Sequence, residues 1–401
     1  MESLKWYISG AILIAVFVAI GLHFNLFISP ANFLRSTANI KTIHMPSYNS
    51  SKYYSRGVVS YGLAGDLASA VISRNASNLT AYQVTTNGIF GCVDIHSIAA
   101  YTPNSPLYVS EYGAGLQLNI NLIINATNGL SYVYWLQNAM LFNTSDDQYQ
   151  IMDSIYNLSF GYLSNISKNT LFGKGNNAII YVSGNGAGQF VKLSSLSSPN
   201  YIYTQNEVIR PFSNATEKNG KFFYLNFTAP WYNYTLPFTY CPIIMINSTV
   251  NSTGTYPVAN FGYSINGNSI FYDNVTFAIP STNAYLLVTP YKNMLHITAL
   301  YDAEFVFGGE GNNQSAAFTE MNATGMWLFY QASNGTFVPF PSLYSSGADT
   351  SEAATNLQVT QGSNYASVGI GTPNLFSNMT LHSSEYNSTE YANVASWIEG
   401  K

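Results

Sequence analysis

The most distinctive chemical feature of the sequence is a pair of carboxylic acids, Asp302 and Glu304, in the stretch YDAEFVFGGEG at residues 301–311. Acids are scarce in this chain, since only 8% of its residues are charged. Two close carboxyl groups cannot both ionise, so one can deprotonate a water molecule while the other donates a proton. The residue types therefore indicate hydrolysis by paired carboxyl groups at low pH.

If this stretch is a β-strand, Asp302 and Glu304 share one face, and Ala303 and Phe305 share the other. Cα atoms two residues apart on a strand lie about 6.5–7 Å from each other, which is too far for the two acids to share a proton. We therefore expect the catalytic partner on a neighbouring strand. The alternative is that both acids are solvated on the outer face of an edge strand.

Gln137, in the run YVYWLQ, is the first candidate partner, and Trp135 lies on the same predicted strand face. In a Gln–Glu pair, Glu304 would act as base and then acid, and the Gln137 amide would orient water and stabilise the tetrahedral oxyanion. Trp135 would wall a substrate cleft. This pattern is similar to the fungal glutamic peptidases, which are β-sandwiches.

Three further positions complete the candidate site. Asp349, in ADTSEAA, resembles the aspartate of the D-T-G or D-S-G loops of pepsin-like enzymes, although the same residues fit a helix capping box. Gly308 and Gly309 begin the stretch GGEGNNQ, which is either a loop over the substrate or a hairpin turn. Asp153, in MDSIYNLS, is interpreted instead as a helix cap.

Other kinds of site lack support in the sequence. Histidines would be charged in acid and useless as bases, and no G-x-S-x-G is present. No C-x-x-C or H-E-x-x-H spacing indicates zinc. GNGAGQ at residues 184–189 lacks the lysine and the helix of a phosphate loop. We therefore expect neither a metal nor a cofactor.

The elements that position these residues are predicted to be strands. Apolar residues alternate from Leu116 to Ile124, with Gln117 and Asn119 on the other face. Similar short runs are separated by Asn-Gly, Asn-Ser and Gly-Asn turns. The fold class is therefore all-β, a sandwich or jelly roll of antiparallel sheets. The best candidates for short helices are residues 145–157 and 347–357.

The chain is expected to have three parts. Residues 1–27 contain the apolar run 6–22 and are predicted to form a hydrophobic helix, either a signal peptide or an uncleaved membrane anchor. Residues 28–56 show no sustained period and are interpreted as a tether or pro-segment. Residues 57–395 form the folded part, as one domain or two sub-lobes.

The composition of the chain limits the classes of molecule that it is expected to bind. The 401 residues include 14 Lys and Arg against 19 Asp and Glu, which argues against binding to nucleic acid. Few charged groups leave little stability to lose when acid protonates them. A surface-layer protein solubilised by sugars would have the same composition. No obligate protein partner is evident.

N-x-S/T acceptors are frequent and indicate a glycosylated exterior protein, extracellular or at the cell surface. The candidate glycosylation sites are Asn75, Asn125, Asn226, Asn274 and Asn334. Cys92 and Cys241 either form one disulfide or remain two buried thiols.

Several blocks, in this order and spacing, resemble the thermopsin family. They are AYQVTTNGIFGCVDIHSIAAY (81–101), YVYWLQNAMLF (132–142), MDSIYNLS (152–159), YDAEFVFGGEGN (301–312) and PSLYSSGADTSEAA (341–354). Thermopsins are secreted acid endopeptidases of acidophilic archaea, classed with the aspartic-type peptidases. The resemblance covers residues 57 to about 385 and implies polypeptide substrates. Glu310 and Cys92 depart from the family's pattern. The alternative function is a non-catalytic, glycosylated surface or adhesion protein on the same scaffold.

Overall fold

Strands make up most of the described structure, as the period-two pattern predicts. In this computed structural model, every described residue belongs to one unit, Ser36–Lys401. The described residues are 41–46, 63–68, 71–74, 78–102, 111–157, 171–175, 178–181, 191–192, 202–203, 207–209, 217–218, 221–222, 231–277, 279–289, 303–309, 315–340, 344–347, 353–361, 365–372 and 397–398.

The larger sheet has fifteen described strands, in the order β1-β4-β20-β6-β7-β8-β10-β13-β12-β11, with five more paired off this path. Its strands are β1 (Lys41–Pro46), β2 (Leu63–Ala68), β3 (Val71–Arg74), β4 (Asn78–Thr86), β6 (Gly113–Ala126), β7 (Ser131–Asn143), β8 (Gln148–Asn157), β10 (Ala178–Tyr181), β11 (Val191–Lys192), β12 (Ile202–Tyr203), β13 (Glu207–Ile209), β16 (Tyr232–Asn233), β20 (Ser281–Val288), β21 (Ala303–Gly308) and β24 (Tyr344–Gly347).

The smaller sheet has ten described strands, in the order β26-β27-β22-β5-β17-β18-β19-β9, with β23 and β25 beside β22. Its strands are β5 (Gly88–Tyr101), β9 (Leu171–Gly175), β17 (Phe238–Asn251), β18 (Gly254–Ile265), β19 (Asn268–Phe277), β22 (Ser315–Gln331), β23 (Phe337–Pro339), β25 (Ala353–Ala354), β26 (Leu357–Gln361) and β27 (Ala366–Ile370). A separate hairpin pairs β14 (Glu217–Lys218) with β15 (Lys221–Phe222).

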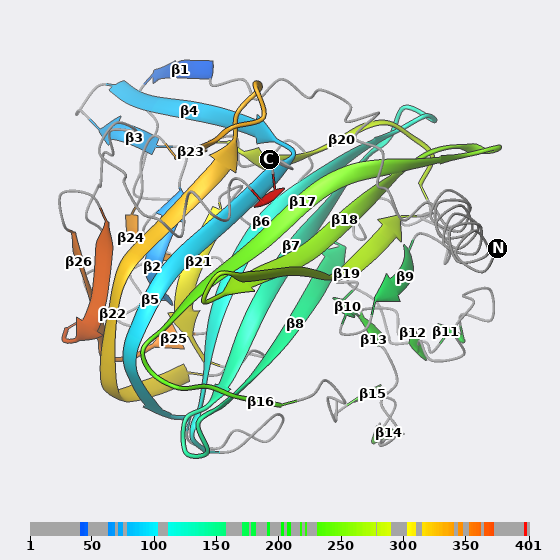
Figure 1. Ribbon diagram of the computed structural model, residues 1–401. Coiled ribbons are helices and arrows are strands. Elements are labelled where there is room, and N and C mark those ends of the chain that lie inside the picture. Colours follow the sequence, from blue (N-terminus) through cyan, green and yellow to red (C-terminus); the bar gives the residue numbers. More distant parts are fainter. Residues whose placement is uncertain are drawn as a thin grey trace, which may run out of the picture. The chain divides into compact units, whose positions relative to one another are not determined.

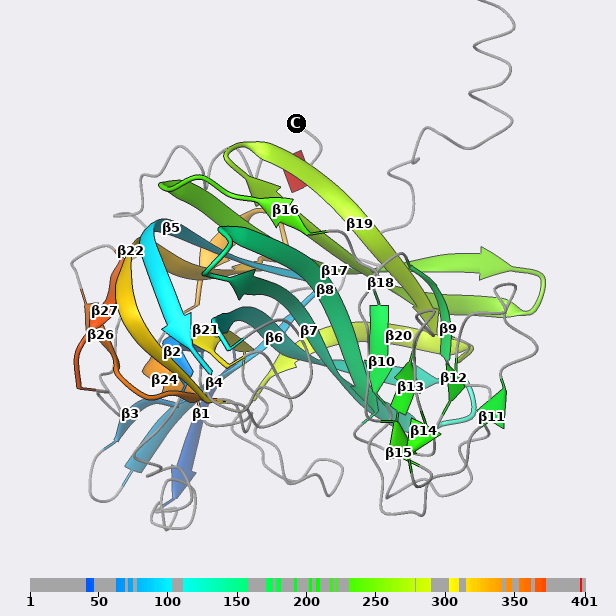
Figure 2. The same cartoon turned by 90° about the horizontal axis from the view of Figure 1, so that it is seen from below.

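The two large sheets pack face to face over one hydrophobic core. β5, β17 and β18 lie across β6, β7 and β8 (Figures 1 and 2). Alternate residues such as Leu118 and Phe305 from the larger sheet meet Val93 and Ile244 from the smaller one. A Cβ added to Gly91 would lie 2.5 Å from the Phe305 ring, so the two sheets approach closely behind β21. The all-β sandwich expected from the sequence is confirmed.

Strand β6 organises the larger sheet around the predicted acids. It pairs with β7 along one side. Its other side pairs first with β21 and then, further along, with β20. β21 in turn pairs with β2, so it has a neighbour on each side. The sheet is antiparallel at these positions, which puts residues of β21, β6 and β7 in directly opposed rows.

Neither predicted helix occurs among the described residues of its range. Residues 148–157 are strand β8, which follows a turn at 144–147 and pairs along its length with β7. In the second region, residues 348–352 lie outside the described part, Gly347 ends β24, and residues 353–357 form β25, a bend and the start of β26. The only helical residues in the described part of the chain are 397 and 398. Pairing with long neighbouring strands outweighs the local capping signals that favoured helices.

The predicted N-terminal helix and the predicted glycosylation sites lie only partly within the described residues. No helix in the described part is long and apolar enough to cross a membrane. The apolar run 6–22 and the predicted glycosylation sites Asn75 and Asn226 lie outside that part. Asn274 and Asn334 are exposed. Asn125 is half-buried and bonds to other polar side chains.

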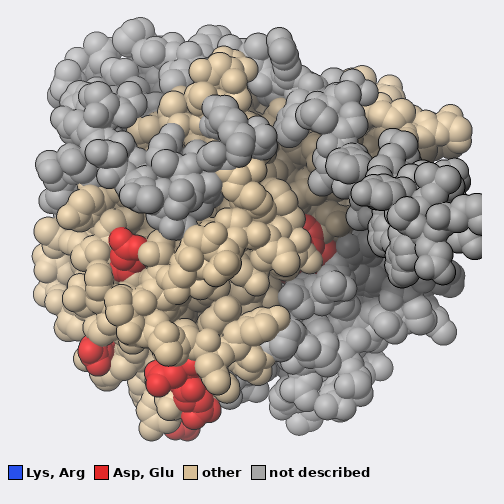
Figure 3. Space-filling view, in the orientation of Figure 1, with Lys and Arg blue, Asp and Glu red and all other residues tan. Residues whose placement is uncertain are grey.

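Cationic side chains are absent from the strands that build the core of the sandwich. No Lys or Arg occurs in residues 78–102, 111–157, 231–289, 303–309 or 315–340. Figure 3 accordingly shows a few acidic patches on the described part of this face, and no basic ones. The sandwich is therefore held by apolar burial and neutral hydrogen bonds rather than by pairs with Lys or Arg along these strands.

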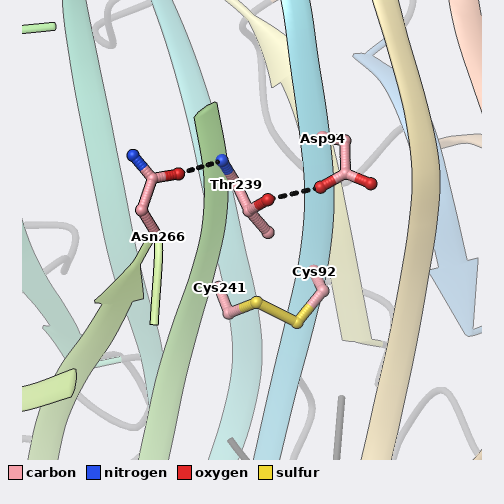
Figure 4. The surroundings of a disulfide bond; sticks show 5 residues. All are labelled: Cys92, Asp94, Thr239, Cys241 and Asn266. Atoms are coloured by element: carbon pink, nitrogen blue, oxygen red, sulfur yellow. Dashed lines mark hydrogen bonds between the residues drawn. A yellow bond between two sulfur atoms is a disulfide. The ribbon is translucent and has the colours of Figure 1, made fainter. Parts of the chain in front are cut away.

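Cys92 and Cys241 form a disulfide that links β5 to β17, with their Cα atoms 4.2 Å apart (Figure 4). Both are buried on the outer face of the smaller sheet, in a second apolar cluster that Trp397 packs against. Next to it, the Thr239 hydroxyl donates to Asp94 Oδ1 at 2.5 Å. Of the two alternatives that the sequence left open, a disulfide or two buried thiols, the structure contains the disulfide.

Candidate active site

Glu304 is the second residue of β21 and is fully buried, with no exposed surface. Because β21 is flanked by β2 and β6, it is not an edge strand, and the expectation of a solvated acid there is wrong for Glu304. Ala303 and Phe305 point into the shared core, so Glu304 lies on the opposite, outer face of the larger sheet. Asp302 lies outside the described residues.

Asn119 lies directly opposite Glu304 on β6. The Asn119 Nδ2 group donates to Glu304 Oε2 at 3.3 Å. The same Nδ2 donates to Gln117 Oε1 at 3.2 Å. These amides lie on the outer face because they alternate with core-facing leucines of β6. A carboxylate and two carboxamides therefore form one hydrogen-bonded group.

Gln137 extends this group onto β7. It lies opposite Asn119, and its Nε2 group donates to Gln117 Oε1 at 3.1 Å. Glu304 and Gln137 are two strands apart, a Cα separation of about 9.5–10 Å. The structure thus brings the predicted pair onto one face, but Asn119 lies between them, with Gln117 two residues along β6. We call Glu304, Asn119, Gln117 and Gln137 the outer polar row.

Burial decreases along the outer polar row. Glu304 and Asn119 have no exposed surface, Gln117 has 4% and Gln137 has 8%. Trp135, two residues from Gln137 on the same strand face, has 6%. The row is therefore least buried at its Gln137 end, next to Trp135.

Gly308 and Gly309 also reach this site. Gly308 lies opposite Gly115, and a Cβ added to Gly115 would be 2.5 Å from the Gly309 carbonyl oxygen and 3.7 Å from Gln117 Nε2. Glycine at 115 is therefore what allows the backbone at Gly309 to lie beside Gln117. The rest of GGEGNNQ, from residue 310, lies outside the described residues, as does Asp349.

A second polar group, which the sequence pattern did not indicate, lies between the sheets. Asn138 follows Gln137 on β7 and faces inward, where its Nδ2 group donates to the carbonyl oxygens of Ile243 at 3.0 Å and Gly262 at 2.8 Å. The Tyr272 hydroxyl donates to Asn138 Oδ1 at 3.0 Å. Asn138 therefore joins the larger sheet to the smaller one.

Two buried acids belong to this second group. Asp153 lies opposite Asn138 on β8 and has no exposed surface, so it is not the helix cap that the sequence suggested. Asp273, on β19, is 3% exposed and follows Tyr272 at a β-bulge. Burial raises the pKa of Tyr272 well above its ordinary value of 10.0, and the Asp153 and Asp273 carboxylates raise it further. We call Asn138, Asp153, Tyr272 and Asp273 the interior group.

The chemistry available at the outer polar row is proton transfer at Glu304 with amide donors beside it. No group of three or more His, Cys, Asp or Glu side chains within the described residues could hold a metal ion. Hydrogen bonds donated to a carboxylate favour its charged form, which opposes the effect of burial. The arrangement supports a Glu that cycles between base and acid, with amide N–H groups next to it.

The region that contains these residues is similar to a known protein family. A family model described as Thermopsin matches residues 41–196 and 196–357, which include the outer polar row and the interior group. The thermopsin of Sulfolobus acidocaldarius is 31% identical over 295 residues, or 73% of this chain and 75% of that protein. The chain therefore belongs to the thermopsin family of peptidases.

Proposed function

We propose that the protein is an exported endopeptidase that hydrolyses polypeptides at low pH, with the outer polar row as its catalytic site. The observation that supports this most directly is the hydrogen bond from Asn119 to the buried Glu304 carboxylate, within a row of carboxamides. A buried acid among amide donors is suited to proton transfer, whereas a structural acid on a strand is more often solvated.

In the proposed reaction, the Glu304 carboxylate takes a proton from a water molecule as the water oxygen attacks the peptide carbonyl carbon. The Gln137 amide donates a hydrogen bond to the oxyanion that forms. Protonated Glu304 then gives its proton to the leaving nitrogen as the C–N bond breaks. The products are a new carboxyl terminus and a new amine, and Glu304 returns to its starting state.

The mechanism assigned here is of the glutamic type, with a Gln–Glu pair. An aspartic-type mechanism would require a second carboxyl group beside Glu304, for which Asp302 and Asp349 are the sequence candidates. The polar groups of β6 and β7 next to Glu304 are carboxamides, which favours the glutamic type.

Binding of the polypeptide is assigned to the more accessible end of the row. Trp135, which is 6% exposed, lies next to Gln137, and the backbone at Gly309 lies beside Gln117, so we place Trp135, Gly308 and Gly309 on the substrate side of the row. Export is a further part of the proposal, and so is glycosylation at Asn274 and Asn334, which the exposure of both side chains supports.

The test is hydrolysis of an acid-denatured protein at about pH 2–3 by the wild type and by Glu304→Gln. We expect activity in the wild type and a loss on the order of 1,000-fold or more in the variant, because the amide cannot take up the proton. A circular dichroism spectrum like that of the wild type is the control for folding. A wild type without peptidase activity would favour the non-catalytic surface protein.

A further inference from the structure

We infer that Asn119 and Gln117 are positioning residues that join Glu304 and Gln137 into one catalytic unit. This inference rests on the proposed function. It concerns two residues that neither the spacing of the acids nor the Gln–Glu pattern singled out.

Glu304 and Gln137 are too far apart to position each other, so other residues must hold them in place. Glu304 and Gln137 lie in the same row but with strand β6 between them, at about twice the spacing of neighbouring strands. Their side chains cannot fix one another at that distance. Asn119 occupies the intervening position in the row, and Gln117 lies two residues along the same face.

Hydrogen bonds run through these two residues without a break. Asn119 Nδ2 contacts Glu304 Oε2 at 3.3 Å and Gln117 Oε1 at 3.2 Å, and Gln137 Nε2 contacts the same Gln117 oxygen at 3.1 Å. Gln117 Oε1 therefore accepts from both neighbours. Because Gln117 presents an oxygen to both neighbours, the Asn119 and Gln137 amides must each turn an N–H group, rather than an oxygen, toward it.

This orientation has a consequence for Glu304. With its N–H group directed toward Gln117 and Glu304, Asn119 supplies a donor to a carboxylate that has no exposed surface. Burial favours a neutral carboxyl, and a base must be charged to accept a proton from water. Asn119 thus keeps Glu304 competent as a base in acid, and Gln117 keeps Asn119 in the orientation that does so.

The first experiment compares Asn119→Leu with Asn121→Leu. Asn121 is the matched control, because it lies on the same face of β6, is 1% exposed, and is opposite Trp135 rather than Glu304. In Asn119→Leu we expect kcat to fall on the order of 100-fold with KM little changed, and the acidic limb of the kcat/KM profile to move to higher pH. Asn121→Leu should leave that limb in place.

The second experiment uses Gln117→Glu and Gln117→Leu, and it remains informative if a leucine variant fails to fold. A protonated Glu at 117 keeps a carbonyl oxygen that can accept from both neighbours, so activity should be retained at about pH 2–3. Above the pKa of the new carboxyl, a second negative charge beside Glu304 should reduce activity at least 10-fold relative to the wild type at the same pH. Gln117→Leu should lose activity throughout.

The outcomes separate the two proposals. Loss of activity in Glu304→Gln, combined with a wild-type pH profile in Asn119→Leu or in Gln117→Glu, would overturn the positioning roles and leave the catalytic assignment intact. Full activity in Glu304→Gln would instead overturn the proposed function. An equal shift of the acidic limb in Asn119→Leu and Asn121→Leu would also reject a specific role for Asn119.

Discussion

The outer polar row and the interior group lie on opposite faces of one sheet and begin at adjacent residues of β7. Gln137 points outward to the first, and Asn138 points inward to the second. Each group places a carboxamide beside a buried acid, so residue type alone does not separate them. The difference lies in what the amides bond to.

In the outer polar row, three hydrogen bonds join side chains to one another and to Glu304. In the interior group, Asn138 donates to two backbone carbonyls of the opposite sheet and accepts from a tyrosine. The first arrangement holds side chains in a fixed relation to one another. The second holds two sheets together. Chemistry is therefore expected at the row and stability from the interior group.

The largest expected effect tests which buried acid is catalytic. Glu304→Gln should lose activity on the order of 1,000-fold or more, whereas Asp153→Asn should keep activity within about 3-fold of the wild type at temperatures where it is folded. The measurement is kcat/KM at about pH 3 for both purified variants. If Asp153→Asn is inactive while folded and Glu304→Gln is active, the roles of the two groups are reversed.

The next effect concerns stability at two adjacent residues. Asn138→Leu leaves two buried carbonyl oxygens of the smaller sheet without this donor and should cost about 3 kcal/mol in free energy of unfolding. Gln137→Leu should cost less than about 1.5 kcal/mol but reduce activity strongly. Urea denaturation at pH 5, with activity assays on the same samples, measures both. Equal destabilisation by the two variants would contradict the comparison.

The sequence predicted which face of a strand each residue occupies. It did not predict which strands lie next to one another. Alternation placed Gln117 and Asn119 opposite the core-facing leucines of β6, and the same period placed Glu304 opposite Phe305. The contact between Asn119 and Glu304 joins residues 185 positions apart. Alternation fixes which face a residue occupies but not which distant strand pairs with it, so this partner was not predictable from the pattern.

The interior group was missed for a related reason. Asp is a residue type typical of helix caps, and this local signal favoured a cap at Asp153. Its actual environment is set by pairing with β7 and by Tyr272, which the bulge between Phe261 and Gly262 directs inward. A bulge changes the period locally and leaves no clear mark in the sequence.

A smaller effect tests the backbone approach that supports the outer polar row. Gly115→Ala places a Cβ 2.5 Å from the Gly309 carbonyl oxygen, so the backbone must shift, at a cost of about 2 kcal/mol. Activity should fall as well, because Gln117 lies beside this contact. The control is Gly369→Ala, whose Cβ would lie 3.8 Å from the nearest atom and should be nearly neutral. Thermal unfolding and peptidase assays of both variants provide the measurement.

The smallest effect distinguishes the two groups by pH, because the interior group contains Tyr272, with other buried tyrosines in the same core, and the outer polar row contains no tyrosine. Burial raises the pKa of Tyr272 and Tyr240 well above 10.0, and burial together with Tyr263 and Tyr232 raises the pKa of Tyr149 to about 12. Above pH 10 the unfolded chain loses these phenol protons while the folded chain keeps them. The unfolded state then binds fewer protons, so stability present below pH 10 is lost as pH rises toward 12.

Tyr272→Phe should therefore act in two ways. At pH 7 it removes the hydrogen bond to Asn138 and should cost about 1 kcal/mol. Between pH 10 and 12 it should reduce the loss of stability by at most about 1.4 kcal/mol per pH unit, because one phenol no longer ionises on unfolding. Urea midpoints at pH 7, 10 and 11.5 measure both effects, and kcat/KM at about pH 3 should be unchanged. A variant with the wild-type slope above pH 10 would show that Tyr272 ionises alike in both states, and the interior group would then lack the low-polarity environment that separates it from solvent.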